Sequence, residues 1–343
     1  MSLHQPLKGV RVVEFEGIGP GPMAGRMLAG MGAEVTALAR PNPRLALRLN
    51  QAQESPLREG KQVIEVDLKT PEGLAQALDH IAGADALIEG NRPGVMERLG
   101  LGPDVCLARN PRLVYGRMTG WGQDGPLANA AGHDLNYLAL TGLLSLSARP
   151  GDRPMAPPTV LGDAGGALGL AFGVACALVD VRGGGPGRVV DAAIVDVVAM
   201  LGMLAQWVRA GGGLGGPQPS PFHDSPYYDS YACADCKFVT VGAMEPQFYD
   251  LFLAKLGLDD VDRAQQDDHA AWPALKARVT QIFRSKTRQE WCDIMEGTDV
   301  CFAPVLTMAE AAAHPHNVAR GIYRKMPGNE LRPAIAPRFL EGS

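Results

Sequence analysis

The stretch RVVEFEGIGPGPMAGRMLAGMGAEVTALAR, residues 11–40, decides the predicted fold. The apolar, β-branched run at its start predicts a strand, and the glycines after it lead into a helix rich in small residues. A second short strand, residues 34–39, follows. Residues 19–24, GPGPMA, fit the pattern G-x-G-x-x-A, which in a strand–helix–strand unit is typical of a dinucleotide-binding turn. The stretch therefore predicts a parallel α/β unit and raises the question of which nucleotide it binds.

Two details of this stretch argue against a nicotinamide dinucleotide. The fingerprint works because backbone N–H groups face a pyrophosphate, and Pro20 and Pro22 have none to donate. The second strand ends at Arg40, where an acidic residue would hold a ribose hydroxyl. An arginine there suits a phosphate on the ribose, either that of NADP or the 3′-phosphate of coenzyme A. A third interpretation is a plain α/β unit whose prolines only begin a helix.

The composition of the chain is that of an ordinary globular protein with room for two domains. It has 343 residues, of which 46% are hydrophobic, and its 32 Lys and Arg against 37 Asp and Glu give a net charge of −5. This mild acidity gives no support for a nucleic-acid or membrane-surface partner. No apolar run of about 18 residues is free of glycine or charge, and no signal region is evident, so we expect a cytoplasmic protein without a membrane span.

Six scattered cysteines also suit a reducing compartment better than a disulfide framework. The one C-x-x-C, Cys233 to Cys236, lacks a second pair of ligands at zinc-finger spacing. Its flanks alternate like a β-hairpin, so we interpret the two cysteines as cross-strand neighbours and expect no metal site.

The first half of the chain alternates strands with helices, which predicts a doubly wound, Rossmann-like parallel sheet covered on both faces. Ligands of such folds bind beyond the carboxyl ends of the strands. The loops of interest therefore follow Phe15, Leu38, Leu68, Glu89 and Met118. Residues 211–221, GGGLGGPQPSP, are typical of a linker, and strands followed by amphipathic helices come after it. We predict a large α/β domain over 1–210, a linker over 211–221, a small α+β domain over 222–324, and a C-terminal segment, 325–343, that returns to the large domain.

Two apolar helical stretches, residues 132–146 and 162–185, begin with groups that can carry chemistry. His133 and Asp134 precede the first, with Asp134 as the predicted N-cap, and Asp163 opens the second. Such aspartates are most often simple caps. Taken together, an imidazole and a carboxyl group facing one pocket could exchange a proton on opposite faces of one carbon. A helix start between them could hold the oxygen of an enolate.

Six segments of the chain resemble the family III CoA-transferase superfamily, and within it the α-methylacyl-CoA racemase branch. They are GIGPGPMAGRMLAGMGAEV (17–35), LIEGNRPGVMERLGLGP (87–103), RLVYGRMTGWGQDGPLANAAGHDLNYLALTG (112–142), LGDAGGALGLAFG (161–173), GRVVDAAIVD (187–196) and VGAMEPQFY (241–249). The resemblance runs from about Leu7 to Phe339. The segment GHDLNY, 132–137, is specific, because the transferases of the superfamily share the downstream aspartate but lack this histidine.

The resemblance implies roles for individual residues. His133 and Asp163 match the two acid/base residues, Glu245 matches the glutamate that orients the histidine, and Arg40 matches the arginine that holds the adenosine phosphate end of CoA. The nucleotide-binding surface would comprise Val66, Asp67, Leu68, Lys69, Gly90, Asn91, Arg92 and Arg98. The thioester would be framed by Gly132, Asp134, Leu135, Asn136 and Tyr137. Asn91 differs from its counterparts in relatives, and residues 41–59 fit the family pattern poorly.

The resemblance also implies an interlocked homodimer whose active site lies between the large domain of one subunit and the small domain of its partner. The expected reaction is racemisation of a 2-methylacyl-CoA thioester by 1,1-proton transfer through an enolate, with no metal and no cofactor beyond the CoA of the substrate. The alternative is CoA transfer to a carboxylic acid through an anhydride on Asp163. A CoA-binding protein without catalysis and an NADP dehydrogenase are further alternatives. The acyl group stays open among branched fatty acids, sterol or bile-acid side chains and arylpropionates.

Overall fold

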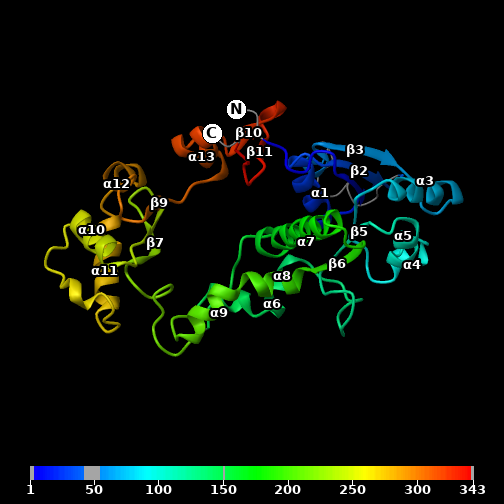
Figure 1. Cartoon of the computed structure of the whole chain (residues 1–343). Coiled ribbons are helices and arrows are strands. Elements are labelled where there is room, and N and C mark those ends of the chain that lie inside the picture. The colour runs from blue at the N-terminus through cyan, green and yellow to red at the C-terminus, as the bar shows by residue number, and fades with distance from the viewer. Residues whose placement is uncertain (1–3, 42–54, 150, 341–343) are drawn as a thin grey trace. The chain divides into compact units, whose positions relative to one another are not determined.

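The structure is a computed structural model that describes residues 4–41, 55–149 and 151–340 (Figure 1). The chain divides into two compact units. Unit 1 comprises Met1–Leu144, Met155–Met203 and Arg332–Ser343, and unit 2 comprises Ser145–Pro154 and Leu204–Leu331. Each unit has a hydrophobic core of its own. The functional domain bounds predicted from the sequence stay a prediction.

Unit 1 is built on a six-stranded sheet in which every neighbouring pair is parallel. Its strands are β1 (Arg11–Phe15), β2 (Glu34–Ala39), β3 (Lys61–Glu65), β4 (Ala86–Glu89), β5 (Val114–Thr119) and β6 (Arg188–Ala193). Their order is β3-β2-β1-β4-β5-β6, so the direction of winding reverses between β1 and β4. The parallel sheet predicted from the β-branched runs is confirmed.

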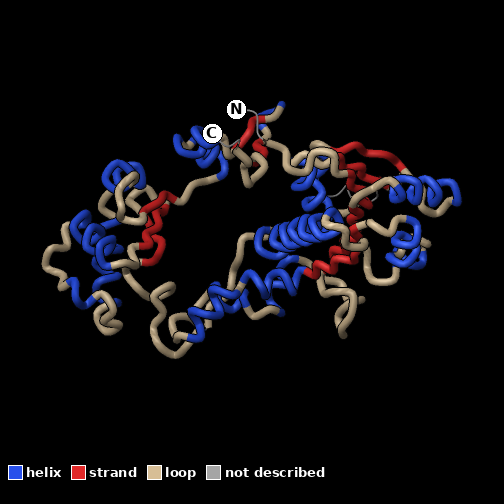
Figure 2. Tube along the Cα trace, in the orientation of Figure 1, coloured by secondary structure: helices blue, strands red, loops and turns tan. Residues whose placement is uncertain are grey.

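Side chains that alternate along the strands form one core on each face of this sheet. Val12 and Ile88 lie in the core covered by α1 (Pro20–Gly30) and α7 (Gly165–Arg182). Val13 and Leu87, the neighbouring residues, lie in the core on the other face. The helices that contribute to this second core are α3 (Pro71–Ala82), α4 (Val95–Arg98) and α5 (Pro103–Arg109). Figure 2 shows these strands in red with the blue helices around them. The doubly wound arrangement follows from this burial of both faces.

Glycines let α7 pack closely on its neighbours. A Cβ at Gly169 would lie 2.5 Å from Val197 of α8 (Ile194–Leu201), and one at Gly173 would lie 2.8 Å from Val190 of β6. The segment Val160–Arg182, with a mean hydropathy of 1.8, is long and apolar enough to cross a membrane by length and composition. The sequence interpretation overlooked it because glycines interrupt the run. One face of α7 packs on β5 and β6, which makes it a core helix of this fold.

Glycines also divide two helical stretches that were predicted to be continuous. α6 (Asp134–Leu140) ends before Gly142, whose φ of 80° is left-handed, and a short 3₁₀ helix, Leu143–Ser147, follows. The apolar stretch after β6 forms two helices, α8 and α9 (Met203–Ala210), which are separated by Gly202. A Cβ at Gly202 would lie 2.5 Å from the Leu143 side chain, so the break allows the two segments to approach closely.

Unit 2 combines an antiparallel sheet with helices. The sheet order is β7-β8-β9. Its strands are β7 (Tyr228–Ala232), β8 (Phe238–Gly242) and β9 (Phe302–Pro304), and the helices are α10 (Pro246–Leu256), α11 (Trp272–Phe283), α12 (Arg288–Met295), α13 (Met308–Ala313) and α14 (Pro315–Arg320). In its core Tyr231 stacks on Phe283, and Trp291 meets Phe283 edge-on. The strands β10 (Tyr323–Lys325) and β11 (Leu331–Pro333) form a separate two-stranded sheet.

The hairpin predicted around the C-x-x-C is present, but its cysteines are not cross-strand neighbours. The N–H of Cys236 donates to the carbonyl of Cys233 at 3.1 Å, so the two residues are the first and last of one turn. Cys233 instead opposes Lys237, to whose carbonyl its N–H donates at 2.8 Å. Cys236 has a φ of 58°, which places it in the turn itself.

Candidate active site

The residues implied to bind CoA lie at one edge of the parallel sheet of unit 1. Arg40 follows β2, residues 66–69 follow β3, and residues 90–92 follow β4. All three positions are carboxyl ends of strands beside the reversal between β1 and β4, where open α/β sheets bind ligands. Arg98, the last residue of α4, comes shortly afterwards along the chain.

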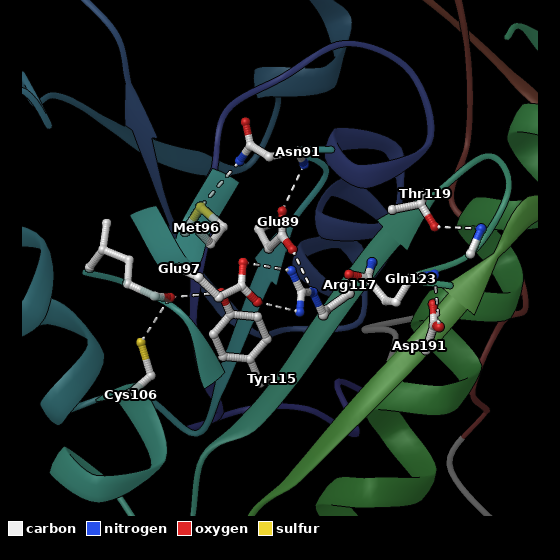
Figure 3. Close-up of polar contacts among 12 residues, drawn as sticks. Glu89, Asn91, Met96, Glu97, Cys106, Tyr115, Arg117, Thr119, Gln123 and Asp191 are labelled. Atoms are coloured by element: carbon white, nitrogen blue, oxygen red, sulfur yellow. Dashed lines mark hydrogen bonds and ion pairs between the residues drawn. The ribbon is translucent and has the colours of Figure 1, made fainter. Parts of the chain in front are cut away.

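A polar network around the buried residues Glu89 and Arg117 fixes the turn after β4 (Figure 3). Arg117 of β5 donates its Nε–H to Glu89 at 3.0 Å, and the second carboxylate oxygen of Glu89 accepts the N–H of Asn91 at 2.7 Å. Glu97, in α4, accepts a hydrogen bond from the guanidinium of Arg117 at 2.8 Å. Burial raises the pKa of the fully covered Glu89, and the nearby donors oppose this rise. Because a carboxylate that accepts charged and backbone donors is fixed in orientation, this network presets the backbone of the turn.

The same network reaches the predicted phosphate-binding arginine. Asn91 accepts a hydrogen bond from Nη2 of Arg40 at 3.3 Å, and its own amide donates to the sulfur of Met96 at 3.3 Å. Asn91 therefore joins the ends of β2 and β4 through its side chain. Residues 42–54, which hold most of the poorly fitting segment 41–59, lie outside the described residues.

His133 is the N-cap of α6, a role that was predicted for Asp134. The backbone of His133 is extended, with φ −135° and ψ 172°, and its N–H donates to Oδ1 of Asn136 at 3.0 Å. Asp134 is the first residue of the helix, and its side chain serves another segment. A carboxylate binds whichever unpaired N–H groups lie closest, and for Asp134 these belong to a different helix start.

Asp163 lies in that other helix start, a turn of π-helix over Val160–Ala164 that leads into α7. Oδ1 of Asp134 accepts the N–H of Gly162 at 2.8 Å and that of Asp163 at 2.9 Å. Burial raises the pKa of the Asp163 carboxyl, the charge of Asp134 raises it further, and His133 opposes both. Asp163 therefore lies within electrostatic range of both His133 and Asp134.

Glycines and aromatic rings make up the surroundings of Asp163. Gly19, in the turn between β1 and α1, has a φ of 79°, and a Cβ there would lie 4.0 Å from Oδ2 of Asp163. The hydroxyl of Tyr137 donates to the carbonyl of Gly132 at 2.5 Å, and its ring meets Trp121 edge-on at 4.7 Å. Burial raises the pKa of Tyr137, and the charge of Asp163 adds to that rise. Gly132, Trp121 and Tyr137 therefore pack against one another close to Asp163.

Glu245 lies in unit 2, exposed at the N-cap of α10. The loop before it is held by a residue that sequence reasoning missed: the buried amide of Gln266 donates to the carbonyl of Met244 at 2.8 Å. Trp272 fixes Gln266 in turn, because its indole N–H donates to the carbonyl of Gln266 at 2.7 Å. No sequence signal marks a lone glutamine as such a support. The contact predicted between Glu245 and His133 of a second subunit stays a prediction.

Comparisons with known proteins show the family of the chain. A sequence model of CoA-transferase family III matches residues 7–341. The chain belongs to CoA-transferase family III. Similar curated proteins include two named alpha-methylacyl-CoA racemase. The one from Homo sapiens is 40% identical and aligns with 97% of this chain and 86% of its own length. The one from Mus musculus is 41% identical and aligns with 92% and 82%. A crystal structure of Rv3272 from Mycobacterium tuberculosis, 26% identical, gives a TM-score of 0.81 over 99% of this chain and 94% of its own.

Within this family III chain the implied site residues fall into three groups. One group lies at the ends of β2, β3 and β4, the second surrounds Asp163, and the third is Glu245 in unit 2. Leu135 and Asn136 of the second group are exposed. Among the residues that the structure describes, no cluster of His, Cys, Asp and Glu could hold a metal ion.

Proposed function

We propose that this family III chain is an α-methylacyl-CoA racemase that exchanges the α-proton of 2-methylacyl-CoA thioesters. The observation that carries the proposal is the buried link from Asp134 to the backbone of Asp163, which holds a carboxyl group beside His133. The identity of about 40% to two proteins named as racemases, over more than nine-tenths of this chain, supports the same activity.

The proposed mechanism uses His133 and Asp163 on opposite faces of the α-carbon. For one enantiomer, neutral His133 removes the α-proton and Asp163 in its acid form delivers another to the opposite face; for the other enantiomer the roles reverse. The raised pKa of Asp163 supports this, because it keeps the acid form present at higher pH than in an exposed aspartate. The oxygen of the enolate would take backbone donors from residues 132–137. The chemistry needs no cofactor beyond the CoA of the substrate.

The CoA moiety would bind along the carboxyl edge of the sheet. Arg40 would hold the phosphate of the adenosine end, and the nucleotide would lie against residues 66–69, Gly90 to Arg92 and Arg98. The polar network through Glu89 supports this placement, because it fixes Asn91 and through it Arg40 before any ligand binds.

We also propose that the active enzyme is a cytoplasmic homodimer with Glu245 supplied to His133 across the subunit interface. An apolar stripe on α7 supports a second copy as the covering partner: Leu168, Phe172 and Val179, spaced by four and seven residues, are 54%, 66% and 73% exposed. These side chains belong to the helix that carries Asp163 at its start. Apolar stripes of this kind are typical of interfaces between subunits.

One assay separates the proposed racemase from a CoA transferase. A single enantiomer of a 2-methylacyl-CoA is incubated with the protein in D₂O without any acceptor acid. We expect deuterium at the α-carbon and loss of optical activity at matching rates. If CoA moves only when a carboxylic acid is added, the protein is a transferase with Asp163 as the nucleophile. Saturable CoA binding without either reaction would leave only a binding protein.

The two proposed acid/base residues can be distinguished because each would act on one face of the α-carbon, and so on one enantiomer. His133→Ala is expected to abolish proton removal from one enantiomer while wash-out from the other enantiomer, initiated by Asp163, survives in part. Asp163→Ala should show the opposite preference. Small and equal losses from both enantiomers would mean that the pair is wrongly assigned.

A further inference from the structure

The side chain of Asp134 binds the backbone at the start of another helix. It is 7% exposed, and one of its oxygens accepts two backbone N–H groups, from Gly162 and Asp163, at 2.8 and 2.9 Å. Gly162 leaves room for it, because a Cβ at that position would lie 2.5 Å from the same oxygen. A buried carboxylate with two short backbone donors is rigidly held.

We infer that Asp134 is a positioning residue that sets the distance between the two acid/base groups and maintains the acid form of Asp163. This inference rests on the proposed racemisation and goes beyond the implied role of Asp134 in framing the thioester. Its basis is connectivity: Asp134 follows His133 directly in the chain, and its side chain holds the backbone of Asp163. One side chain therefore fixes the separation of base and acid.

The turn that carries Asp163 needs such an anchor. It begins after Thr159, a β-branched residue with a left-handed φ of 63°, and continues as a π-helical turn before α7 takes regular form. Both features are less stable than an ordinary helix start and require support from their surroundings. The N–H groups that Asp134 accepts belong to the start of a helix, where intrahelical acceptors are missing. Without Asp134 the turn would lose two hydrogen bonds, and the carboxyl group of Asp163 would lose its fixed direction.

The charge of Asp134 acts on Asp163 as well. Within the described part of the chain, the titratable groups that interact with Asp163 are His133, Asp134 and Tyr137, all from α6 or its cap. Burial of Asp163 and the negative charge of Asp134 both raise the pKa of Asp163, and His133 lowers it. Removing only the charge of Asp134 must therefore lower the pKa of Asp163, whereas removing the hydrogen bonds must disturb its position.

Two substitutions separate these effects. Asp134→Asn keeps an oxygen that can accept both N–H groups and removes the charge. Asp134→Ala removes both. Asp104→Asn is the matched control, because Asp104 also lies in the first turn of a helix, α5, and is exposed. The readouts are the pH profile of kcat/KM for each enantiomer, and the titration of Asp163 followed by carboxyl ¹³C NMR with Asp163→Asn for assignment.

With Asp134→Asn we expect the limb of the pH profile that reports the ionisation of Asp163 to move to lower pH for both enantiomers. It is the alkaline limb where Asp163 acts as the acid and the acidic limb where it acts as the base. Activity at the optimum should stay within about tenfold of the wild type. With Asp134→Ala we expect kcat to fall roughly 100-fold, as for a displaced reacting group, with a KM changed only a few-fold. The control should match the wild type throughout.

An Asp134→Asn profile and a ¹³C titration that both superimpose on the wild type would overturn the inference, even if the alanine variant does not fold. The NMR titration does not depend on turnover. If the wild type exchanges no α-proton, the proposed function fails, while a lowered Asp163 pKa in Asp134→Asn would still support the electrostatic part of the inference.

Discussion

Replacing Gly25 by alanine is expected to disrupt the buried ion pair between Glu14 and Lys61. Gly25 lies in α1 and faces the sheet, and a Cβ there would lie 1.8 Å from Oε2 of Glu14 and 3.1 Å from Nζ of Lys61. Nζ of Lys61 is 2.6 Å from that oxygen and 2.7 Å from the carbonyl of Pro22, and the two charged side chains are each 1% exposed. The methyl group has no space unless the pair separates.

The size of the effect follows from two opposing contributions. Separating a buried ion pair costs about 3–5 kcal/mol, because each charge is left without its partner in a dry surrounding. Alanine is favoured over glycine inside a helix by about 1 kcal/mol. The net loss in the free energy of unfolding is then about 3 kcal/mol. For a unit of roughly 150–250 residues this lowers Tm by about 6–12 °C.

The assay is thermal unfolding of the Gly25→Ala variant, with Gly21→Ala as the control from the same helix. A Cβ at Gly21 would meet only Ile88, at 4.0 Å, so the control should keep or slightly raise the Tm. Because Lys61 also binds Pro22, near the turn that carries Gly19, Gly25→Ala should lower kcat/KM as well. Equal Tm values for the two variants would refute the reasoning, since the contact would then be relieved without separating the pair.

Three further predictions concern binding, assembly and pH. Arg40→Ala should raise KM for CoA thioesters about 10- to 150-fold with little change in kcat, because one charged hydrogen bond is lost. Asn91→Ala should raise this KM only a few-fold. The KM for thioesters of dephospho-CoA, measured for comparison, should not change in either variant. If the proposed homodimer forms through α7, Phe172→Glu should give a monomer in sedimentation velocity and abolish the proposed exchange. An active dimeric variant would show that the stripe on α7 is not the interface. Burial raises the pKa of Glu14 to about 6, above its value in an unfolded chain. The contribution of Glu14 to stability is therefore present below about pH 4.5 and is lost as the pH rises through about 6. Urea unfolding of the wild type should show this fall in the free energy of unfolding with pH, and Glu14→Gln should not.

The fold could be predicted from the sequence because its signals are local. β-branched runs between helical segments place β1 to β6, and a strand's carboxyl end follows directly from its position in the chain. That is why Arg40 and Asn91, which follow two strands, could be expected at one edge. The break at Gly202 could not be foreseen, because it depends on close packing against Leu143, far away in sequence.

The candidate site could be predicted only in part, because its local signals are visible in the sequence and its long-range contacts are not. Helix-start patterns and the family resemblance select His133 and Asp163, but not what holds them. An aspartate before a helix is normally assigned to its own helix, and only the folded chain shows that Asp134 caps another. The support given to the Glu245 loop by Gln266 has no local pattern at all. Side-chain partners that are distant in sequence are chosen by packing, which single-residue preferences do not encode.

The two polar systems of unit 1 support the proposal that the CoA-binding residues and the acid/base residues are held by separate networks. Glu89 orients Asn91 and Arg40 at the ends of β2 and β4, whereas Asp134 joins α6 to the start of α7. The structure records no hydrogen bond between the two sets among its described residues. Substitutions in the first set should therefore change KM and leave the pH profile alone, and substitutions in the second should do the reverse. If Asn91→Ala and Asp134→Asn showed strong non-additivity in kcat/KM, the separation would be wrong, and the two systems would have to be coupled through the β1–α1 turn at Gly19 that lies beside Asp163.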